Sequence, residues 1–246
     1  MHFRDRAIIR LETVDSTNNY AANLLRLSSP PDGTVITAQE QTHGKGQRGS
    51  SWVALKGDNL LTSMIVYPNF LNASNSFGLS QITAIAVKET IESLCEKDVY
   101  IKWPNDIIVN NKKIAGILIE YNWADTKIQS AIIGCGININ QRQFELLAAQ
   151  SLRMITGRHL PTESVLDVLI DRFDRLYDSL KQGKRDEIRK TYLQHLYKFQ
   201  EKAAYHFQNE IIHAVISDVA DNGKLILIKE NGEEIRADIK EISLIF

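Results

Sequence analysis

The chain has 246 residues, a length that suits one large domain or one large domain with a small one. Hydrophobic residues make up 43%, enough for a buried core, and a net charge of -1 argues against a general nucleic-acid binder, which needs a clear basic excess. The two cysteines make no disulfide framework, the N-terminus does not resemble a signal peptide, and no apolar run reaches about 18 residues. We therefore expect a cytoplasmic protein without a membrane-spanning helix.

The first three quarters of the chain predict alternating strands and helices. Strands are expected at residues 8–14, 34–38, 59–67, 99–102, 107–109, 113–121 and 127–139, and helices at 80–96 and 162–180. A further helix is expected to begin at Ser16 or Thr17, whose hydroxyl can cap it. Asn110-Asn111 predicts a hairpin turn because Asn tolerates positive φ, and Gly183 is expected to end the long second helix.

The C-terminal region has a different pattern. Short alternating runs at residues 211–219, 224–229 and 234–239 are separated by the turn sequences 221–223 and 231–232. This pattern predicts a small β-barrel-like unit. We therefore expect a larger domain over residues 1–190 and a small domain over residues 195–246.

The least regular stretch, residues 39–56, contains Gly44, Gly46 and Gly49 with the spacing G-x-G-x-x-G. A dinucleotide-binding loop would be followed by a helix and, about 20 residues later, by an acid, and neither follows. A kinase loop would be followed by H-R-D and D-F-G, and a Walker A loop would carry Ser or Thr after Gly-Lys. Lys45 and Arg48 beside glycines suit a bound phosphate or carboxylate, with a solvated surface loop as the alternative.

Two lysines stand in further polar clusters. In Lys102-Trp103-Pro104-Asn105-Asp106, the Trp-Pro pair is expected to hold an extended backbone. The amide of Asn105 can then donate and accept at an adenine edge, although an ordinary turn is an equal alternative. Lys113 begins an apolar strand that contains Gly116, and it suits either a phosphate contact or a charge that discourages edge pairing.

A glycine-containing strand end, Gly134-Cys135-Gly136, leads to Asn138. Its small residues permit a ligand to lie against the sheet. Cys135 is interpreted as a packing residue and not a nucleophile, because no histidine lies nearby in sequence, and Cys95 is expected in the core. No Cys/His cluster has zinc spacing, so no metal-binding residues are predicted.

Four segments in this order resemble the biotin protein ligase family. They are residues 15–18, residues 44–49 with Trp52, residues 102–106, and residues 113–118 followed by 134–138. The resemblance implies an α+β fold, in which a mixed β-sheet with flanking helices precedes a small C-terminal SH3-like β-barrel domain. It also implies the monofunctional type without a DNA-binding domain, because the catalytic pattern begins within the first fifteen residues.

The resemblance implies a reaction in two steps. The biotin carboxylate attacks the α-phosphate of ATP to give biotinyl-5′-AMP and pyrophosphate, and a lysine of a biotin carboxyl carrier protein then displaces AMP. ATP and Mg²⁺ are the implied cofactors, because cations must offset the repulsion between two anions. No DNA or membrane partner is implied, and a homodimer through sheet edges is possible.

The family's site residues are carried over by position. Those expected to bind biotin are Ser16, Thr17, Asn18, Gln41, Gly44, Lys45, Lys113, Gly116 and Gly136. Those expected to bind ATP or the adenylate are Lys45, Gln47, Arg48, Trp52, Asn105, Lys113 and Asn138. The expected catalytic residues are Lys113, Lys102, Arg48 and Asp106. The usual loop is G-R-G-R-x-G, so Lys45 and Gln47 replace two arginines, and a point charge stands at 45 where the family has a guanidinium fork.

Two alternatives remain open. A lipoate ligase or octanoyltransferase would lack the Lys102–Asp106 segment in this form, and would have a hydrophobic acyl tunnel in place of the polar Ser16, Thr17 and Gln41. A non-catalytic biotin-sensing module would bind the same ligand without catalysing ATP–pyrophosphate exchange.

Overall fold

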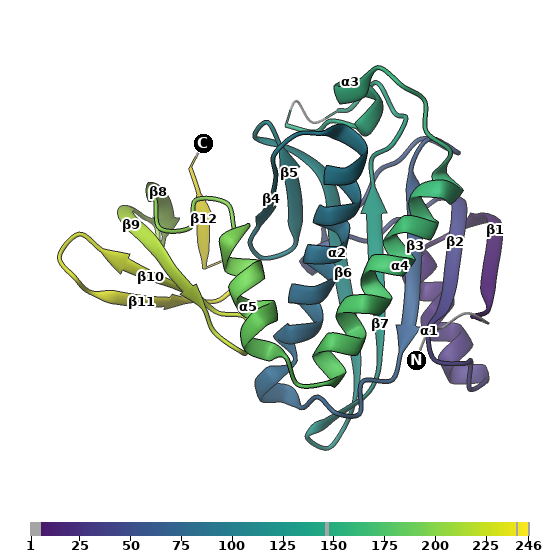
Figure 1. The fold of residues 1–246 in the computed structure, drawn as a ribbon, viewed down its shortest axis with the longest axis horizontal. Coiled ribbons are helices and arrows are strands. Elements are labelled where there is room, and N and C mark those ends of the chain that lie inside the picture. Colours follow the sequence, from purple (N-terminus) through teal and green to yellow (C-terminus); the bar gives the residue numbers. More distant parts are fainter. Residues whose placement is uncertain (1–5, 146–147, 240, 246) are drawn as a thin grey trace.

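A seven-stranded mixed sheet forms the centre of the molecule (Figure 1). The computed structural model describes residues 6–145, 148–239 and 241–245. The strands are β1 (Ile8–Val14), β2 (Thr34–Gln41), β3 (Leu60–Val66), β4 (Val99–Lys102), β5 (Asp106–Val109), β6 (Lys112–Ala124) and β7 (Lys127–Ile137). They lie in the order β1-β2-β3-β7-β6-β5-β4, and β1 and β2 are parallel whereas the other neighbours are antiparallel.

Helices cover both faces of this sheet. They are α1 (Thr17–Leu27), α2 (Phe77–Cys95), α3 (Leu152–Thr156), α4 (Thr162–Lys181) and α5 (Arg185–Gln194), with the 3₁₀ turns η1 (Gln47–Gly49) and η2 (Ala73–Asn75). In Figure 1, α2 and α4 lie side by side in front of the sheet. On the opposite face, Ala21 of α1 packs with Ile36, Ile65 and Ile132 of β2, β3 and β7.

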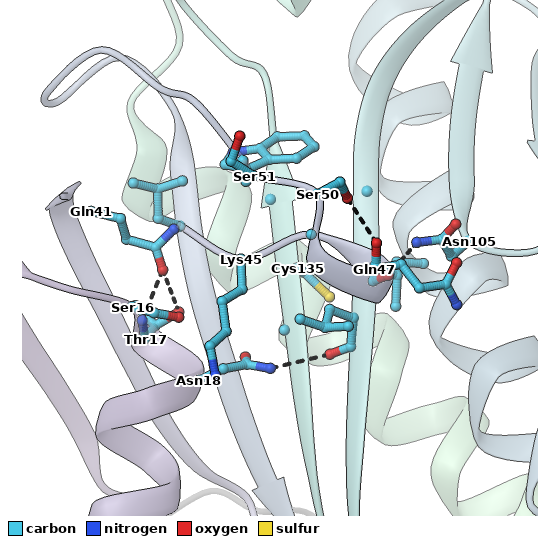
Figure 2. Close-up of a pocket in the computed structure, with 18 of the residues that line it drawn as sticks. Ser16, Thr17, Asn18, Gln41, Lys45, Gln47, Ser50, Ser51, Asn105 and Cys135 are labelled. Atoms are coloured by element: carbon cyan, nitrogen blue, oxygen red, sulfur yellow. Dashed lines mark hydrogen bonds between the residues drawn. The ribbon is translucent and has the colours of Figure 1, made fainter. Parts of the chain in front are cut away.

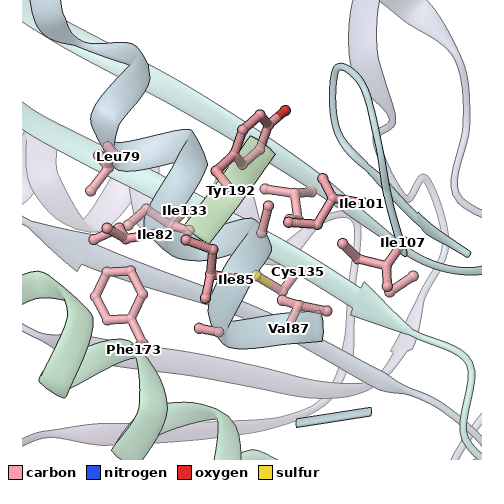
Figure 3. Close-up of a cluster of buried hydrophobic side chains, with 14 of the residues drawn as sticks. Leu79, Ile82, Ile85, Val87, Ile101, Ile107, Ile133, Cys135, Phe173 and Tyr192 are labelled. Carbon is pink, nitrogen blue, oxygen red and sulfur yellow. The ribbon is translucent and has the colours of Figure 1, made fainter. Parts of the chain in front are cut away.

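Helix α2 is apolar around most of its circumference and therefore lies deep in the larger core. Ile82 and Ile85 are fully buried, and Phe173 of α4 and Tyr192 of α5 belong to the same cluster (Figure 3). Within the described part of the chain, no helix is both long and apolar enough to cross a membrane.

A second, five-stranded antiparallel sheet follows α5. Its strands are β8 (Lys202–Phe207), β9 (Glu210–Val219), β10 (Leu225–Lys229), β11 (Glu234–Ala237) and β12 (Ile242–Leu244), in the order β11-β10-β9-β8-β12. Trp103 Nε1 donates to the carbonyl oxygen of Gly223, 2.9 Å away, and thereby joins the two sheets. The second sheet is consistent with an SH3-like domain. A barrel was expected, but the described strands form an open sheet and no closed barrel. The domain division between residues 190 and 195 stays a prediction.

Most expected elements are confirmed, and the first strand has the predicted bounds. Asn110 and Asn111 have φ of 47° and 60°, and Gly183 has φ of 81°, as their turns require. Two local predictions are wrong. Ser16 occupies the cap position of α1 but its side chain makes no capping bond. Trp103-Pro104 has a cis peptide bond within a turn, where an extended backbone was expected.

Candidate active site

The cavity lies on the α1 face of the large sheet, and side-chain alternation explains its position. Every second residue of a strand faces the same side, so Ile132 under α1 is followed on that face by Gly134 and Gly136. Their partners on β6 are Leu118 opposite Gly134 and Gly116 opposite Gly136. Three of these four positions lack a side chain, and the space left beside the start of α1 is a cavity of about 450 Å³ (Figure 2).

The glycine-rich segment folds back on itself over this cavity. Gly44 and Trp52 form a backbone hydrogen bond of 2.9 Å, and Gly46 and Ser50 form another of 2.7 Å, with η1 at the tip. A Cβ on Gly44 would lie 2.3 Å from the carbonyl oxygen of Trp52, so only glycine fits there. Gly49 has φ of 86°, which also favours glycine. The glycines therefore shape a tight hairpin.

The indole of Trp52 lies against the glycine floor. A Cβ on Gly136 would be 2.5 Å from Cε2 of this ring, and one on Gly116 would be 2.8 Å from Cζ3. The indole Nε1 is buried and has no hydrogen-bond partner among the described residues. Sequence reasoning assigned this floor to biotin and Trp52 to the adenylate. A ligand that lies on both glycines must therefore displace the ring.

A β-bulge turns Lys113 into the cavity. Between β5 and β6 the pairing passes from Ile107–Ala115 to Ile108–Lys113, so Ile114 is an extra residue. Regular alternation would turn Lys113 away from Gly116, because the two are three positions apart along the strand. With the bulge, Lys113 Nζ lies 3.3 Å from the position of a Cβ on Gly116. The motif spacing alone gave no sign of this bulge.

The ammonium of Lys113 has two further neighbours. Its Nζ lies 2.6 Å from Oδ1 of Asp106 and 5.4 Å from the centre of the Trp52 ring. The backbone of Lys113 is held by hydrogen bonds to Ala148 and Gln150, so the point from which its side chain extends is fixed. A cation paired with a carboxylate on a cavity wall can stabilise negative charge that develops on a ligand.

A polar cluster forms the other end of the cavity, at the start of α1. Ser16, Thr17 and Asn18 are all buried there. The N–H and hydroxyl of Thr17 donate to Oε1 of Gln41, at 2.8 and 3.0 Å, which explains why that hydroxyl does not cap the helix. Figure 2 shows the side chain of Lys45 extending from the hairpin toward Asn18. Residues far apart in sequence thus supply hydrogen-bonding groups to one small volume.

Three predicted site residues do not line the first cavity, and the side chain of a fourth is not described. Lys102 lines a neighbouring cavity of about 300 Å³, which shares Gln47 and Asp106 with the first. Gly44 lies in the hairpin, on the wall of a third cavity. Asn138 is buried, and its Nδ2 donates to the carbonyl oxygen of Gln150 at 3.1 Å. The side chain of Arg48 lies outside the described part of the structure, so its assignment stays a prediction.

Asn105 lines the first cavity but already has a structural bond. Its Nδ2 donates to the carbonyl oxygen of Ile117 at 2.8 Å, and its backbone carbonyl oxygen accepts from the N–H of Ile117. A nucleotide contact from this side chain would therefore use Oδ1 or the second N–H of Nδ2.

Sequence reasoning missed two polar residues on the α1 face. Ser63 of β3 donates a hydrogen bond toward both Thr17 and Asn18, and Glu120 of β6 accepts one from Asn18. Ser63 stands between Leu61 and Ile65 on its face of β3, and Glu120 follows Leu118 on its face of β6. Alternation with Leu61 and Ile65, and with Leu118 and Gly116, is the signal that would have placed them on the cavity side.

Nucleophilic catalysis by cysteine is disfavoured, as expected. Cys135 is buried, and this burial raises the pKa of its thiol to about 12, so it stays protonated. Cys95 is also buried and free. Among the described residues, no three His, Cys, Asp or Glu side chains cluster as metal ligands. Asp106 is the single carboxylate among the residues that line the first cavity.

The fold and the cavity define a class of α+β protein with a polar cavity that contains a paired lysine and aspartate. The model of the biotin/lipoate A/B protein ligase family matches residues 11–138, which include the whole cavity floor. The chain therefore belongs to this family.

Individual relatives agree with this assignment. The bifunctional ligase/repressor BirA of Bacillus spizizenii is 31% identical over 175 residues, which are 69% of this chain and 53% of that protein. The chain thus spans about half the length of the Bacillus relatives it matches. The biotin–[acetyl-CoA-carboxylase] ligase of Paracoccus denitrificans is 29% identical, over 92% of this chain and 95% of its own.

A solved structure has the same overall fold. The biotin protein ligase from Aquifex aeolicus in complex with biotin and ATP is 25% identical and superimposes with a TM-score of 0.80, over 97% of this chain and 98% of that one. The similarity therefore extends over the second sheet, beyond the region that the family model matches.

Proposed function

We propose that this chain is a biotin protein ligase, which uses ATP to activate biotin as biotinyl-5′-AMP and transfers it to a lysine of a biotin carboxyl carrier protein. The observation that carries the proposal is the cavity itself. A polar pocket at the start of α1 and the Lys113–Asp106 pair stand at opposite ends of one glycine floor. The named functions of the Paracoccus and Aquifex relatives support it.

In the first step, a carboxylate oxygen of biotin bonds to the α-phosphorus of ATP, and the bond to the pyrophosphate oxygen breaks. Two anions must approach each other, so cations are needed where they meet. Lys113 lies on the wall of the cavity, and Lys45 reaches in from the hairpin. A hairpin over the cavity also excludes water, to which the mixed anhydride is sensitive.

In the second step, the amine of the acceptor lysine attacks the acyl carbon, AMP leaves, and the amine gives up a proton. Asp106 is the carboxylate available on this wall, and it borders both the first cavity and the one that contains Lys102. The position of Lys102 favours a role with the incoming amine over a role at the glycine floor. Burial lowers the pKa of Lys102, and Lys113 lowers it further, whereas Asp106 raises it.

Mg²⁺ is a further part of the proposal. Mg²⁺ sites in nucleotide enzymes use one or two carboxylates together with substrate phosphates, and Asp106 fits that requirement. When bound, the ion would offset negative charge on the triphosphate. Asp106 would then exchange its present contact with Lys113 for a contact with the ion.

Biotin is favoured over lipoate by the polarity of the far end of the cavity. Ser16, Thr17 and Gln41 line it, and an acyl chain of lipoate or octanoate offers no partner for these groups. Burying their remaining donors and acceptors against a hydrocarbon would leave these atoms without partners, which costs about 1–3 kcal/mol for each group. A ureido ring provides both donors and an acceptor.

The test is to mix the protein with ATP, Mg²⁺, biotin and a carboxyl carrier domain and to weigh the carrier. We expect a mass increase of one biotinyl group. A lipoyl domain with lipoate or octanoate is the competing acceptor pair, and modification of that pair alone would overturn the proposal. ATP–pyrophosphate exchange that depends on biotin separates a ligase from a binding module, because a module without chemistry shows none.

A further inference from the structure

Glu120 does not line the first cavity, yet it touches a residue that does. Its Oε2 accepts a hydrogen bond of 2.7 Å from Nδ2 of Asn18. Asn18 is 3% exposed, and a Cβ on Gly134 would lie 2.4 Å from its Oδ1, so the amide is held flat against β7. The same Nδ2 also lies 3.4 Å from the carbonyl oxygen of Leu118, a weaker contact. Both neighbours can only accept, and therefore Asn18 turns its N–H₂ group toward Glu120 and its oxygen away.

The orientation of Asn18 determines the next hydrogen bond. Its Oδ1 lies 2.6 Å from the hydroxyl of Ser63, which also lies 2.7 Å from Oγ1 of Thr17. Ser63 has one proton to donate, and Asn18 Oδ1 requires it. The Thr17 hydroxyl then donates its proton to Ser63 or to Gln41. In either case the acceptor is another side chain of the protein and not a ligand. On the cavity side, Thr17 therefore presents lone pairs.

We propose that Glu120 is a positioning residue for the ligand: by orienting Asn18 it draws the Ser63 proton away from Thr17, and so leaves the lone pairs of the Thr17 hydroxyl for a donor on the ligand at the polar end of the cavity. Gln41 is fixed independently, because its Oε1 accepts from the Thr17 backbone N–H, so its Nε2 remains a donor. One acceptor beside one donor matches a ligand that carries an N–H next to a carbonyl oxygen. This inference rests on the proposed function, in which the ureido ring of biotin is that ligand.

A second contact of Glu120 gives a competing explanation for any effect of its removal. Its Oε1 lies 3.8 Å from Nζ of Lys45, and both side chains are more than two-fifths exposed. Such a pair is weak and is screened by salt, whereas the 2.7 Å bond to a buried amide is not. The contact with Asn18 therefore dominates, and ionic strength distinguishes the two.

The test uses Glu120→Leu, which nearly keeps the size but removes the acceptor for the Asn18 amide. In biotin-dependent ATP–pyrophosphate exchange, we expect KM for biotin to rise about tenfold, as for loss of a hydrogen bond to a charged group, while kcat stays within about twofold. The rise should persist at high salt. The matched control is Glu163→Leu, which removes an exposed carboxylate of α4 that accepts from Arg10, and should leave KM unchanged.

Ser63→Ala removes the hydroxyl proton that competes for Thr17, so it should leave KM for biotin nearly unchanged. In that background Glu120→Leu should no longer raise KM, because no Ser63 proton remains to be directed. An unchanged KM in Glu120→Leu, a KM effect that disappears at high salt, or the full effect of Glu120→Leu in the Ser63→Ala background would each overturn the inference and leave the proposed function intact. Absence of exchange in the unaltered protein would overturn both.

Discussion

Two stretches of a single sheet face behave in opposite ways. The closed stretch lies under α1 and carries Ile36, Ile65 and Ile132, which pack against Ala21 and exclude solvent. The open stretch lies a few residues further along β7 and carries Gly134 and Gly136, and a cavity takes the place of a helix there. The backbone pairing continues through both stretches. Side-chain size alone therefore decides which part of the face serves stability and which part can hold a ligand.

The largest expected effect is in the open stretch. Lys113→Ala should reduce the rate of biotin-dependent ATP–pyrophosphate exchange by roughly 10²–10³-fold, the usual cost of losing one group that stabilises developing charge. The free energy of unfolding should change little, because this side chain is partly exposed. The control is Lys112→Ala, the exposed preceding residue. Near-normal exchange in Lys113→Ala would remove this residue from the mechanism.

The closed stretch should respond in the opposite way. Ile132→Ala leaves a void beneath α1, so the free energy of unfolding should fall by about 2–4 kcal/mol, measured by denaturant titration. KM for biotin and for ATP should stay unchanged, because Ile132 does not line the cavity. A change in either KM at preserved stability would show that the two stretches are not separate in function.

A smaller effect is expected when a methyl group is added to the glycine floor of the open stretch. Gly136→Ala places a Cβ 2.5 Å from the Trp52 ring, which must move. We expect KM for biotin to rise roughly tenfold, in line with the cost of overpacking. Tryptophan emission should shift, because the half-buried indole of Trp52 becomes more exposed. If neither quantity changes, Trp52 does not lie on this floor in solution.

The smallest effect concerns the neighbouring cavity. The lowered pKa of Lys102 means that its cationic form is lost at a lower pH than that of an ordinary lysine. If that charge is needed, the rate of transfer to the carrier should decline on the alkaline side before exchange does. Lys102→Arg keeps its charge over this range, so it should move the decline to higher pH. Identical pH profiles for the two proteins would argue against a charged Lys102 in the transfer step.

Much of the fold followed from local patterns. The buried strands, the long helix α4 and the Asn110-Asn111 turn were predictable, because periodicity and turn preferences act over a few residues. Helices α3 and α5 and strands β8 and β12 were not predicted. Strand β12 has three residues, and α5 buries only two side chains, Ile188 and Tyr192, so neither has a clear periodic signal.

The candidate site divides in the same way. The order of the motifs was enough to nominate Lys113, Gly116, Gly136 and Gln41 together, and all four line one cavity. The hydrogen bonds of Asn138 and the neighbouring cavity of Lys102 were not foreseeable, because both depend on segments distant in sequence.

The sequence by itself determined which residue types are available and which strands form, because both depend on neighbours along the chain. Tertiary structure decided where each side chain points. The extra residue at Ile114 reverses the face of Lys113, and long-range pairing brings Glu120 and Ser63 to Asn18. Such outcomes depend on strand register and on hydrogen bonds between distant segments, and neither leaves a trace in local composition.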